Sequence, residues 1–310
     1  MCGIVAAASQ ANIIDILTDG LGRLEYRGYD SAGIAFINNE TISSHKKKGN
    51  VSKLTQSLDD NLISNIGIAH TRWATHGEPS EKNAHPHLAE NNIAIVHNGI
   101  IENYIDIKNK FFKDKIFNSN TDSEVLVHLI NYFSKENEIL DSVYLAVNEI
   151  KGSYAIAVLD KRNPNKIIGA RNGSPLIIGI GNKENFIASD IQALIKHTDK
   201  FVYLEDGDLV TITSEEVKIF DKNKKNIRRE TKKSSLTSNS NSKGDFDHFM
   251  LKEIFEQPEA VKSTIQDRII NNFVPKEILG PNAEKFLKKF KVVQIIACGT
   301  SYHAALVAKH

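Results

Sequence analysis

Apolar residues along the first 220 or so positions fall into short runs separated by Gly, Asn and Asp. These runs are typical of β-strands bounded by turns: Ile66–Ala69, Ile93–Val96, Tyr154–Leu159 and Pro175–Ile180. Two other stretches repeat apolar residues at three-to-four spacing, from Ile13 to Leu24 before Gly28 and from Val125 to Phe133 after Asp122, which predicts amphipathic helices. Many strands with few helices between them favour stacked sheets covered by helices over a regular β-α-β alternation.

The pattern changes after about residue 220. Residues 222–243 contain eight Lys or Arg and one Glu, and a Ser/Asn tract runs from Ser234 to Ser242. Such a stretch has little apolar area to bury, which predicts a solvated linker over residues 221–245. Binding of a nucleic acid by these basic residues is the alternative, and the absence of interleaved aromatic residues disfavours it.

A different pattern begins at residue 246. The continuous apolar run Val292–Ile296 predicts a buried parallel strand, and Ala304–Lys309 predicts a helix after it. Between them, Cys298, Gly299, Thr300 and Ser301 supply hydroxyls and backbone N–H groups that suit phosphate at a helix N-terminus, although a bare turn is the alternative. One β-α unit cannot cover both faces of a parallel sheet, so we expect a truncated α/β domain.

Charge and cysteine content restrict the partners and the compartment. The chain has 39 Lys and Arg against 38 Asp and Glu, so its net charge does not favour binding to nucleic acid or to an anionic membrane. Cys2 and Cys298 lie far apart, which suits a reducing compartment and predicts a cytoplasmic protein. Since the sequence has neither a signal-peptide pattern nor an apolar run of membrane-spanning length, we expect no membrane association.

Cys2 is the first candidate for chemistry. A small second residue permits removal of Met1, which would give Cys2 a free α-amine. Such an amine has a pKa of about 7.7 to 8.0, so near neutral pH a fraction can act as a base for the neighbouring thiol. The alternative is a small apolar cysteine in an edge strand. Position alone leaves both interpretations open.

The dipeptide Asn98-Gly99 also has two interpretations. Between Ile93–Val96 and Ile100-Ile101 it is a strong signal for a type I′ hairpin turn. However, the residues after Gly99 do not alternate as a returning strand would. A side-chain amide next to a glycine N–H can instead stabilise the oxyanion of an acyl-transfer intermediate.

Thr121-Asp122-Ser123-Glu124 precedes a periodic apolar run and matches a capping box, with Thr121 as N-cap and Glu124 at the third helical position. Asp122 is not the capping residue in this arrangement. Its carboxylate is therefore also available to bind the ammonium group of an amino acid.

Five histidines between residues 70 and 97 are dense enough to suggest a metal: His70, His76, His85, His87 and His97. Neither a Cys partner, a His-Glu-x-x-His helix nor a carboxylate triad accompanies them. We therefore expect no metal and no other cofactor.

Four blocks together resemble one family, the glutamine–fructose-6-phosphate aminotransferases (isomerizing), also called glucosamine-6-phosphate synthases. They are MCGIV at 1–5, RLEYRGYDSAG at 23–33, HTRWATHG at 70–77 and HNGIIEN at 97–103. Related class II amidotransferases, such as asparagine synthetase and amidophosphoribosyltransferase, share the terminal Cys and the Asn-Gly pair but resemble the other blocks less. His248–Pro258 and Cys298–Tyr302 resemble the beginning of this family's sugar isomerase (SIS) domain.

This resemblance implies an α+β fold, a four-layer αββα N-terminal-nucleophile hydrolase sandwich over residues 2–220, followed by the incomplete α/β isomerase domain at 246–310. It implies that mature Cys2 attacks the side-chain amide of glutamine and releases ammonia. Asn98 and Gly99 would form the oxyanion hole, Arg72 would bind the glutamine carboxylate, and Asp122 would bind its ammonium group.

The resemblance also implies roles around the nucleophile. Thr75 and His76 lie in the loop expected to close over glutamine, and Trp73 matches the residue that gates the ammonia channel. Arg27 and Gly28 are expected to organise the surroundings of Cys2.

In the full-length family, ammonia aminates fructose 6-phosphate to glucosamine 6-phosphate, and we expect a homodimer there. Residues 298–301 match the first phosphate loop of that reaction. The family's second phosphate loop and its catalytic Lys, Glu and His have no counterpart in these 310 residues. Two alternatives therefore stay open, a stand-alone glutaminase and a non-catalytic remnant that binds glutamine.

Overall fold

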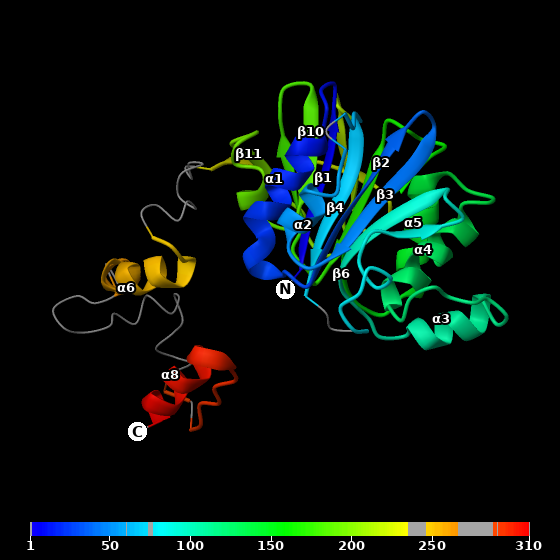
Figure 1. Cartoon of the computed structure of the whole chain (residues 1–310). Coiled ribbons are helices and arrows are strands. Elements are labelled where there is room, and N and C mark those ends of the chain that lie inside the picture. The colour runs from blue at the N-terminus through cyan, green and yellow to red at the C-terminus, as the bar shows by residue number, and fades with distance from the viewer. Residues whose placement is uncertain are drawn as a thin grey trace. The chain divides into compact units, whose positions relative to one another are not determined.

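The computed structural model describes residues 2–59, 61–73, 77–234, 246–265, 288–289 and 291–309. The chain divides into two compact units, Met1–Ser242 and Lys243–His310. In the first unit, two β-sheets pack face to face, and helices cover the outer face of each (Figure 1).

The first sheet has eight strands in the order β15-β11-β9-β10-β1-β4-β2-β3. Their bounds are β1 (Gly3–Ser9), β2 (Ser31–Asn38), β3 (Thr41–Lys48), β4 (Ile66–Arg72), β9 (Ile177–Ile180), β10 (Glu184–Ala188), β11 (Lys200–Tyr203) and β15 (Thr231–Lys233). β1 pairs antiparallel with both β4 and β10, with Gly3 opposite Thr71 and Val5 opposite Ala188. Cys2 therefore leads into an interior strand, and the edge-strand interpretation is wrong.

The second sheet has seven strands in the order β14-β13-β12-β8-β7-β6-β5. Their bounds are β5 (His87–Ala89), β6 (Ile93–Ile101), β7 (Gly152–Asp160), β8 (Ile167–Asn172), β12 (Leu209–Ile212), β13 (Val217–Phe220) and β14 (Asn226–Ile227). Each of the four strands predicted from apolar runs corresponds to an observed one: β4, β6, β7 and β9.

Helices form the two outer layers. The first sheet is covered by α1 (Ile14–Leu24), α2 (Val51–Thr55) and the 3₁₀ turn η2 (Ile191–Ala193), with η1 (Glu25–Arg27) directly after α1. The second is covered by α3 (Tyr104–Phe111), α4 (Asp122–Phe133) and α5 (Ile139–Glu149). The predicted αββα sandwich is confirmed.

Side chains of β1 alternate between two cores. Ile4 and Ala6 lie in the core between the sheets, whereas Val5 and Ala7 lie in the core beneath α1. Because both faces of this strand are covered, its sequence is apolar throughout instead of alternating.

The start of α4 differs in part from the predicted capping box. Thr121 is the N-cap, and its Oγ1 accepts a hydrogen bond from the Glu124 N–H at 3.3 Å, as predicted. The Glu124 carboxylate, however, accepts from the backbone N–H groups of Asn118 and Ser119, at 2.7 and 2.5 Å. Glu124 therefore anchors the segment before the helix.

Part of the predicted linker is β-structure. Asn226–Ile227 form β14, which pairs with β13, and Thr231–Lys233 form β15, which pairs with β11. Each is the outermost strand of its sheet, where backbone pairing suffices and exposed lysines are tolerated. Residues 235–245 of the linker lie outside the described residues.

The second unit contains α6 (Phe249–Ile265) and α8 (Gly299–Lys309), and α8 includes the predicted helix at Ala304–Lys309. The buried strand predicted at Val292–Ile296 is wrong, since these residues are not paired and Val292 and Ile296 are 82% and 89% exposed. A buried parallel strand requires neighbouring strands, and the described part of this unit contains none. Among the described residues of both units, no helix has the length and apolar content needed to cross a membrane.

The electrostatics of Glu124 lead to a stability prediction. Burial opposes its ionisation, but the nearby His128 side chain and the hydrogen bonds from Ser119 and Asn118 outweigh burial and lower the pKa of Glu124 to about 2 from 4.5. Since the folded-state pKa is the lower one, the stabilisation is complete above pH 4.5 and is lost as the pH falls toward 2.

We expect Glu124→Gln to lower the free energy of unfolding at pH 7 by about 2 to 3 kcal/mol. The difference from wild type should shrink by about 1 kcal/mol between pH 7 and pH 4, because the unfolded carboxyl begins to take up its proton there. Urea unfolding followed by circular dichroism measures both quantities. Glu149→Gln is the control, since its contact with Lys110 is a partly exposed ion pair worth under about 1 kcal/mol. A pH-independent difference at Glu124 would contradict the assignment.

Candidate active site

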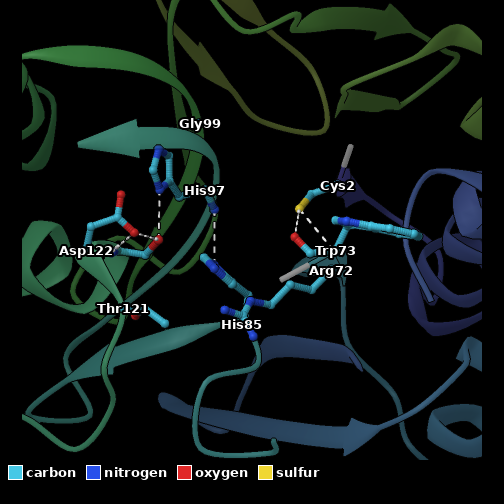
Figure 2. Close-up of a pocket in the computed structure, with 9 residues that line it drawn as sticks. Cys2, Arg72, Trp73, His85, His97, Gly99, Thr121 and Asp122 are labelled. Atoms are coloured by element: carbon cyan, nitrogen blue, oxygen red, sulfur yellow. Dashed lines mark hydrogen bonds between the residues drawn. The ribbon is translucent and has the colours of Figure 1, made fainter. Parts of the chain in front are cut away.

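A small cavity, partly open to solvent, lies where the start of β1, the end of β4, β6 and the N-terminus of α4 converge (Figure 2). Its walls are formed by nine residues: Cys2, Arg72, Trp73, His85, His97, Gly99, Thr121, Asp122 and Ser123.

The Cys2 thiol lies against the backbone of Trp73. Its Sγ is 3.3 Å from the Trp73 N and 3.6 Å from the Trp73 O. Burial raises the pKa of the Cys2 thiol, while the hydrogen bond with Trp73 and the positive charge of Arg72 act in the opposite direction. The net pKa is raised, so a base close to the sulfur is needed to generate the reactive thiolate near neutral pH.

Two glycines allow this close packing. A Cβ on Gly3 would lie 2.8 Å from the Leu24 Cβ, and a Cβ on Gly28 would lie 2.6 Å from the carbonyl carbon of Arg72. The Gly28 carbonyl also accepts a hydrogen bond from the Thr71 hydroxyl. Gly28 thus holds the end of β4, and with it the Trp73 backbone, beside Cys2.

Asn98-Gly99 is not a hairpin turn, because β6 continues through it to Ile101 and pairs with β7 along its whole length. Gly99 has φ +133°, and a Cβ there would lie 2.0 Å from the Ser153 carbonyl oxygen, so a side chain is excluded. The Asn98 Nδ2 donates a hydrogen bond to the Cys2 carbonyl at 3.1 Å. The Asn98 amide therefore contacts Cys2 and Gly99 lines the same cavity, although both residues lie within strand β6.

Asp122 and Arg72 place opposite charges on the same cavity. Asp122 is the first residue of α4, and its carboxylate accepts hydrogen bonds from the backbone N–H groups of Ile101 at 2.7 Å and Ser123 at 3.0 Å. A carboxylate has about four lone-pair sites, so acceptor capacity remains for a ligand. Arg72 ends β4 and is 4% exposed. Such a pair suits the two charged groups of a free amino acid.

The histidines form a buried layer beside the cavity. The rings of His70 and His85 stack at 4.2 Å, and His85 meets His87 edge-on at 4.6 Å. Burial lowers the pKa of the four histidines of this layer, because it disfavours the imidazolium, and the pKa of His70 falls to about 3; they are His70, His85, His87 and His97. Within the described residues, no group of three or more His, Cys, Asp or Glu is arranged to hold a metal ion.

Several predicted site residues lie elsewhere. The Arg27 guanidinium does not line the cavity and instead pairs with Asp190 after β10. Trp73 does line the cavity, but its side chain is 46% exposed and packs edge-to-face on Tyr29 at 5.3 Å. Thr75 and His76 lie outside the described residues. Cys298, Gly299, Thr300 and Ser301 belong to the second unit, where α8 begins at Gly299.

Sequence reasoning missed the part that Ser123 and His85 play in the cavity. The Ser123 Oγ lies 2.8 Å from His97 Nδ1, and His85 Nδ1 accepts a hydrogen bond from the His97 N–H at 3.3 Å. The position of Ser123 next to Asp122 was one available signal. For His85, the only signal was the density of histidines.

Comparison with known proteins agrees with this geometry. A family model described as a glutamine amidotransferase domain matches residues 70–196. Proteins from Shewanella oneidensis and Escherichia coli (strain K12), both named glutamine–fructose-6-phosphate aminotransferase [isomerizing], are 49% and 46% identical to the chain. Each alignment covers all of this chain but 51% of the relative, so the chain spans about half the length of these curated relatives. The resemblance noted in the sequence is confirmed.

Solved structures give the same fold. A glutamine phosphoribosylpyrophosphate amidotransferase from B. subtilis, complexed with ADP and GMP, is 26% identical, with a TM-score of 0.62 over 71% of this chain and 49% of its own. A structure described as the allosteric regulatory enzyme of purine biosynthesis is 27% identical, with the same TM-score and the same coverage.

The packing of Gly28 leads to a prediction about Cys2. Gly28→Ala should displace the Arg72–Trp73 backbone and weaken the Trp73 N–H contact with sulfur, which raises the thiol pKa further. We expect alkylation of Cys2 by iodoacetamide at pH 7 to slow by about 3- to 10-fold. Peptide mass spectrometry measures the rate, with Cys298 as the internal reference.

Gly22→Ala is the matched control, because a Cβ there meets nothing within 4 Å and α1 tolerates alanine. Its Cys2 alkylation rate should equal that of wild type. Equal rates for both variants would show that Gly28 does not position the Trp73 backbone.

Proposed function

We propose, on the premise that the chain carries a glutamine amidotransferase domain, that it hydrolyses L-glutamine to glutamate and ammonia with Cys2 as the nucleophile. The observation that supports this most strongly is one cavity lined by a thiol, a buried arginine, an aspartate and a strand glycine, with the Asn98 amide directed at Cys2.

In the proposed reaction, the Cys2 Sγ attacks the side-chain carbonyl carbon of glutamine. The carbonyl oxygen becomes an oxyanion, which the Asn98 Nδ2 and the Gly99 N–H would stabilise. When the C–N bond breaks, the nitrogen takes a proton and leaves as ammonia. Water then attacks the resulting thioester, and glutamate is released with the thiol restored.

The base in this proposal is the α-amine of Cys2 after removal of Met1. Burial raises the pKa of the thiol, so spontaneous ionisation near neutral pH is small. A neutral amine on the same residue can accept the thiol proton, directly or through water, and return it to the leaving nitrogen. Intact mass of the purified protein tests whether Met1 is removed.

Glutamine recognition is proposed to use both charges of the cavity. Arg72 would bind the α-carboxylate, and Asp122 would bind the α-ammonium with the lone pairs that Ile101 and Ser123 leave available. Thr75 and His76 are proposed to close over the substrate, and Trp73 to gate the exit of ammonia. Arg27 is proposed to support this region through its ion pair with Asp190.

We further propose that the ammonia serves amination of fructose 6-phosphate to glucosamine 6-phosphate, as the names of the relatives suggest. Cys298, Gly299, Thr300 and Ser301 would then contribute to phosphate binding, in a segment that leads into α8. A cytoplasmic location and a homodimeric full-length protein belong to the same proposal. Mass spectrometry of reactions with glutamine and fructose 6-phosphate tests the product.

The first prediction of this mechanism concerns the nucleophile. Cys2→Ala should abolish glutamate release, and Cys2→Ser should leave little, since a hydroxyl is a far weaker nucleophile with only an amine as base. A coupled glutamate assay measures the rates. An unchanged circular dichroism spectrum and retained glutamine binding would establish that Cys2→Ala abolishes the reaction without disturbing the fold. Substantial glutamate release from Cys2→Ala would rule out the mechanism and favour another nucleophile.

The second prediction separates binding from turnover. Arg72→Ala and Asp122→Asn should each raise KM for glutamine about tenfold or more, because each removes a charge-assisted contact worth about 1.5 to 3 kcal/mol. Asn98→Ala should instead lower kcat about a hundredfold or more, because an oxyanion donor acts in the transition state.

Matched controls for this series lie on the helix surface. Asp106→Asn and Asn148→Ala change exposed positions of α3 and α5 and should leave both kinetic constants at wild-type values. The proposed roles would be refuted if Asn98→Ala raised only KM or if Arg72→Ala lowered only kcat.

A further inference from the structure

His70 connects the two sheets directly behind the proposed oxyanion hole. It lies in β4 of the first sheet, two residues before Arg72, and is fully buried. Its Nε2 is 3.1 Å from the carbonyl oxygen of His97 and 2.9 Å from the Oδ1 of Asn98, both in β6 of the second sheet.

These contacts determine which nitrogen of the His70 ring carries the proton. The His97 carbonyl can only accept a hydrogen bond, so the His70 Nε2 must carry a proton and donate. The other ring nitrogen, Nδ1, is buried without a hydrogen-bond partner among the described residues, and a proton there would be an unsatisfied donor. Burial, which lowers the pKa of His70 to about 3, agrees with a neutral ring protonated on Nε2.

The same proton determines the orientation of the Asn98 amide. Since Nε2 donates, the Asn98 atom facing it must be the carbonyl Oδ1, and the Nδ2 then points toward Cys2. If the amide were flipped, its NH₂ group would face the N–H donor of His70, and its oxygen would face the Cys2 carbonyl oxygen. It would also place an oxygen, instead of an N–H group, against a developing oxyanion.

We propose that His70 is a positioning residue that holds the Asn98 carboxamide with its N–H groups toward the oxyanion. This inference rests on the proposed glutamine hydrolysis. His70 touches neither substrate nor sulfur in this scheme and acts only through Asn98.

The kinetic test compares two substitutions of His70. His70→Phe keeps a buried ring but removes the donor, and should lower kcat for glutamine hydrolysis about 10- to 100-fold with KM near the wild-type value. His70→Gln can donate from its Nε2 and should restore most of kcat. His197→Phe, a histidine outside this layer, should behave as wild type.

Two further measurements separate positioning from a general structural role. Alkylation of Cys2 by iodoacetamide forms no oxyanion, so its rate should be unchanged in His70→Phe. In the double variant with Asn98→Ala, the loss should equal that of Asn98→Ala alone, because His70 acts through that amide. Fully additive losses, or slowed alkylation together with raised KM, would overturn the proposal.

The ring proton can also be tested in the wild-type chain, without any activity assay. Long-range ¹H–¹⁵N NMR should show a pyrrole-like Nε2 and a pyridine-like Nδ1 for His70, constant between about pH 5 and 9. The His70→Gln spectrum identifies the signal. The opposite tautomer, or a titration in this range, would overturn the proposal. If the tautomer is as expected but wild type releases no glutamate, the proposed function fails and the orientation of Asn98 stands.

Discussion

The antiparallel pairing of β1 with β4 is the constraint on which the site depends. With Gly3 opposite Thr71, Cys2 lies beside Arg72 and the Trp73 backbone. β1 is paired on its other side with β10, so a slip in its register would break backbone pairs with both neighbours. A slip by one residue would also move the side chains of β1 from one core to the other. The thiol is therefore held by a rigid interior strand, although it is only the second residue of the chain.

The close packing of the two sheets provides the second half of the site. Small residues on the facing strands, such as Ala6, Ala35, Ala94 and Ala155, lie in the core between the sheets among larger Ile, Leu and Val side chains. Across this core, His70 from β4 reaches the His97 backbone and the Asn98 side chain of β6. The Cys2 thiol comes from one sheet and the Asn98 amide that faces it from the other, and buried hydrogen bonds keep their relative positions.

Burial has opposite consequences for the titratable groups of this region. It raises the pKa of the Cys2 thiol and lowers the pKa of His70, His85 and His87, since in each case it disfavours the charged form. The histidine layer therefore supplies directed hydrogen bonds and no positive charge. Charges lining the cavity come instead from Arg72 and Asp122, at the positions proposed to bind the ends of an amino acid.

The sequence by itself determined the strands at Ile93–Val96 and Tyr154–Leu159, the helices α1 and α4 and the N-cap at Thr121, because each follows from side-chain periodicity or local hydrogen bonding. Through its family resemblance, it also determined the layered fold and the candidate nucleophile. Only the tertiary structure decided that Asn98-Gly99 lies within a strand, that Glu124 anchors the preceding loop, and that Val292–Ile296 is not a strand. These outcomes depend on partners distant in the chain: β7 pairs along the whole of β6, whereas Val292–Ile296 has no described strand beside it. Local patterns specify which conformation a segment favours, but long-range pairing determines whether that segment is covered and which side chains meet.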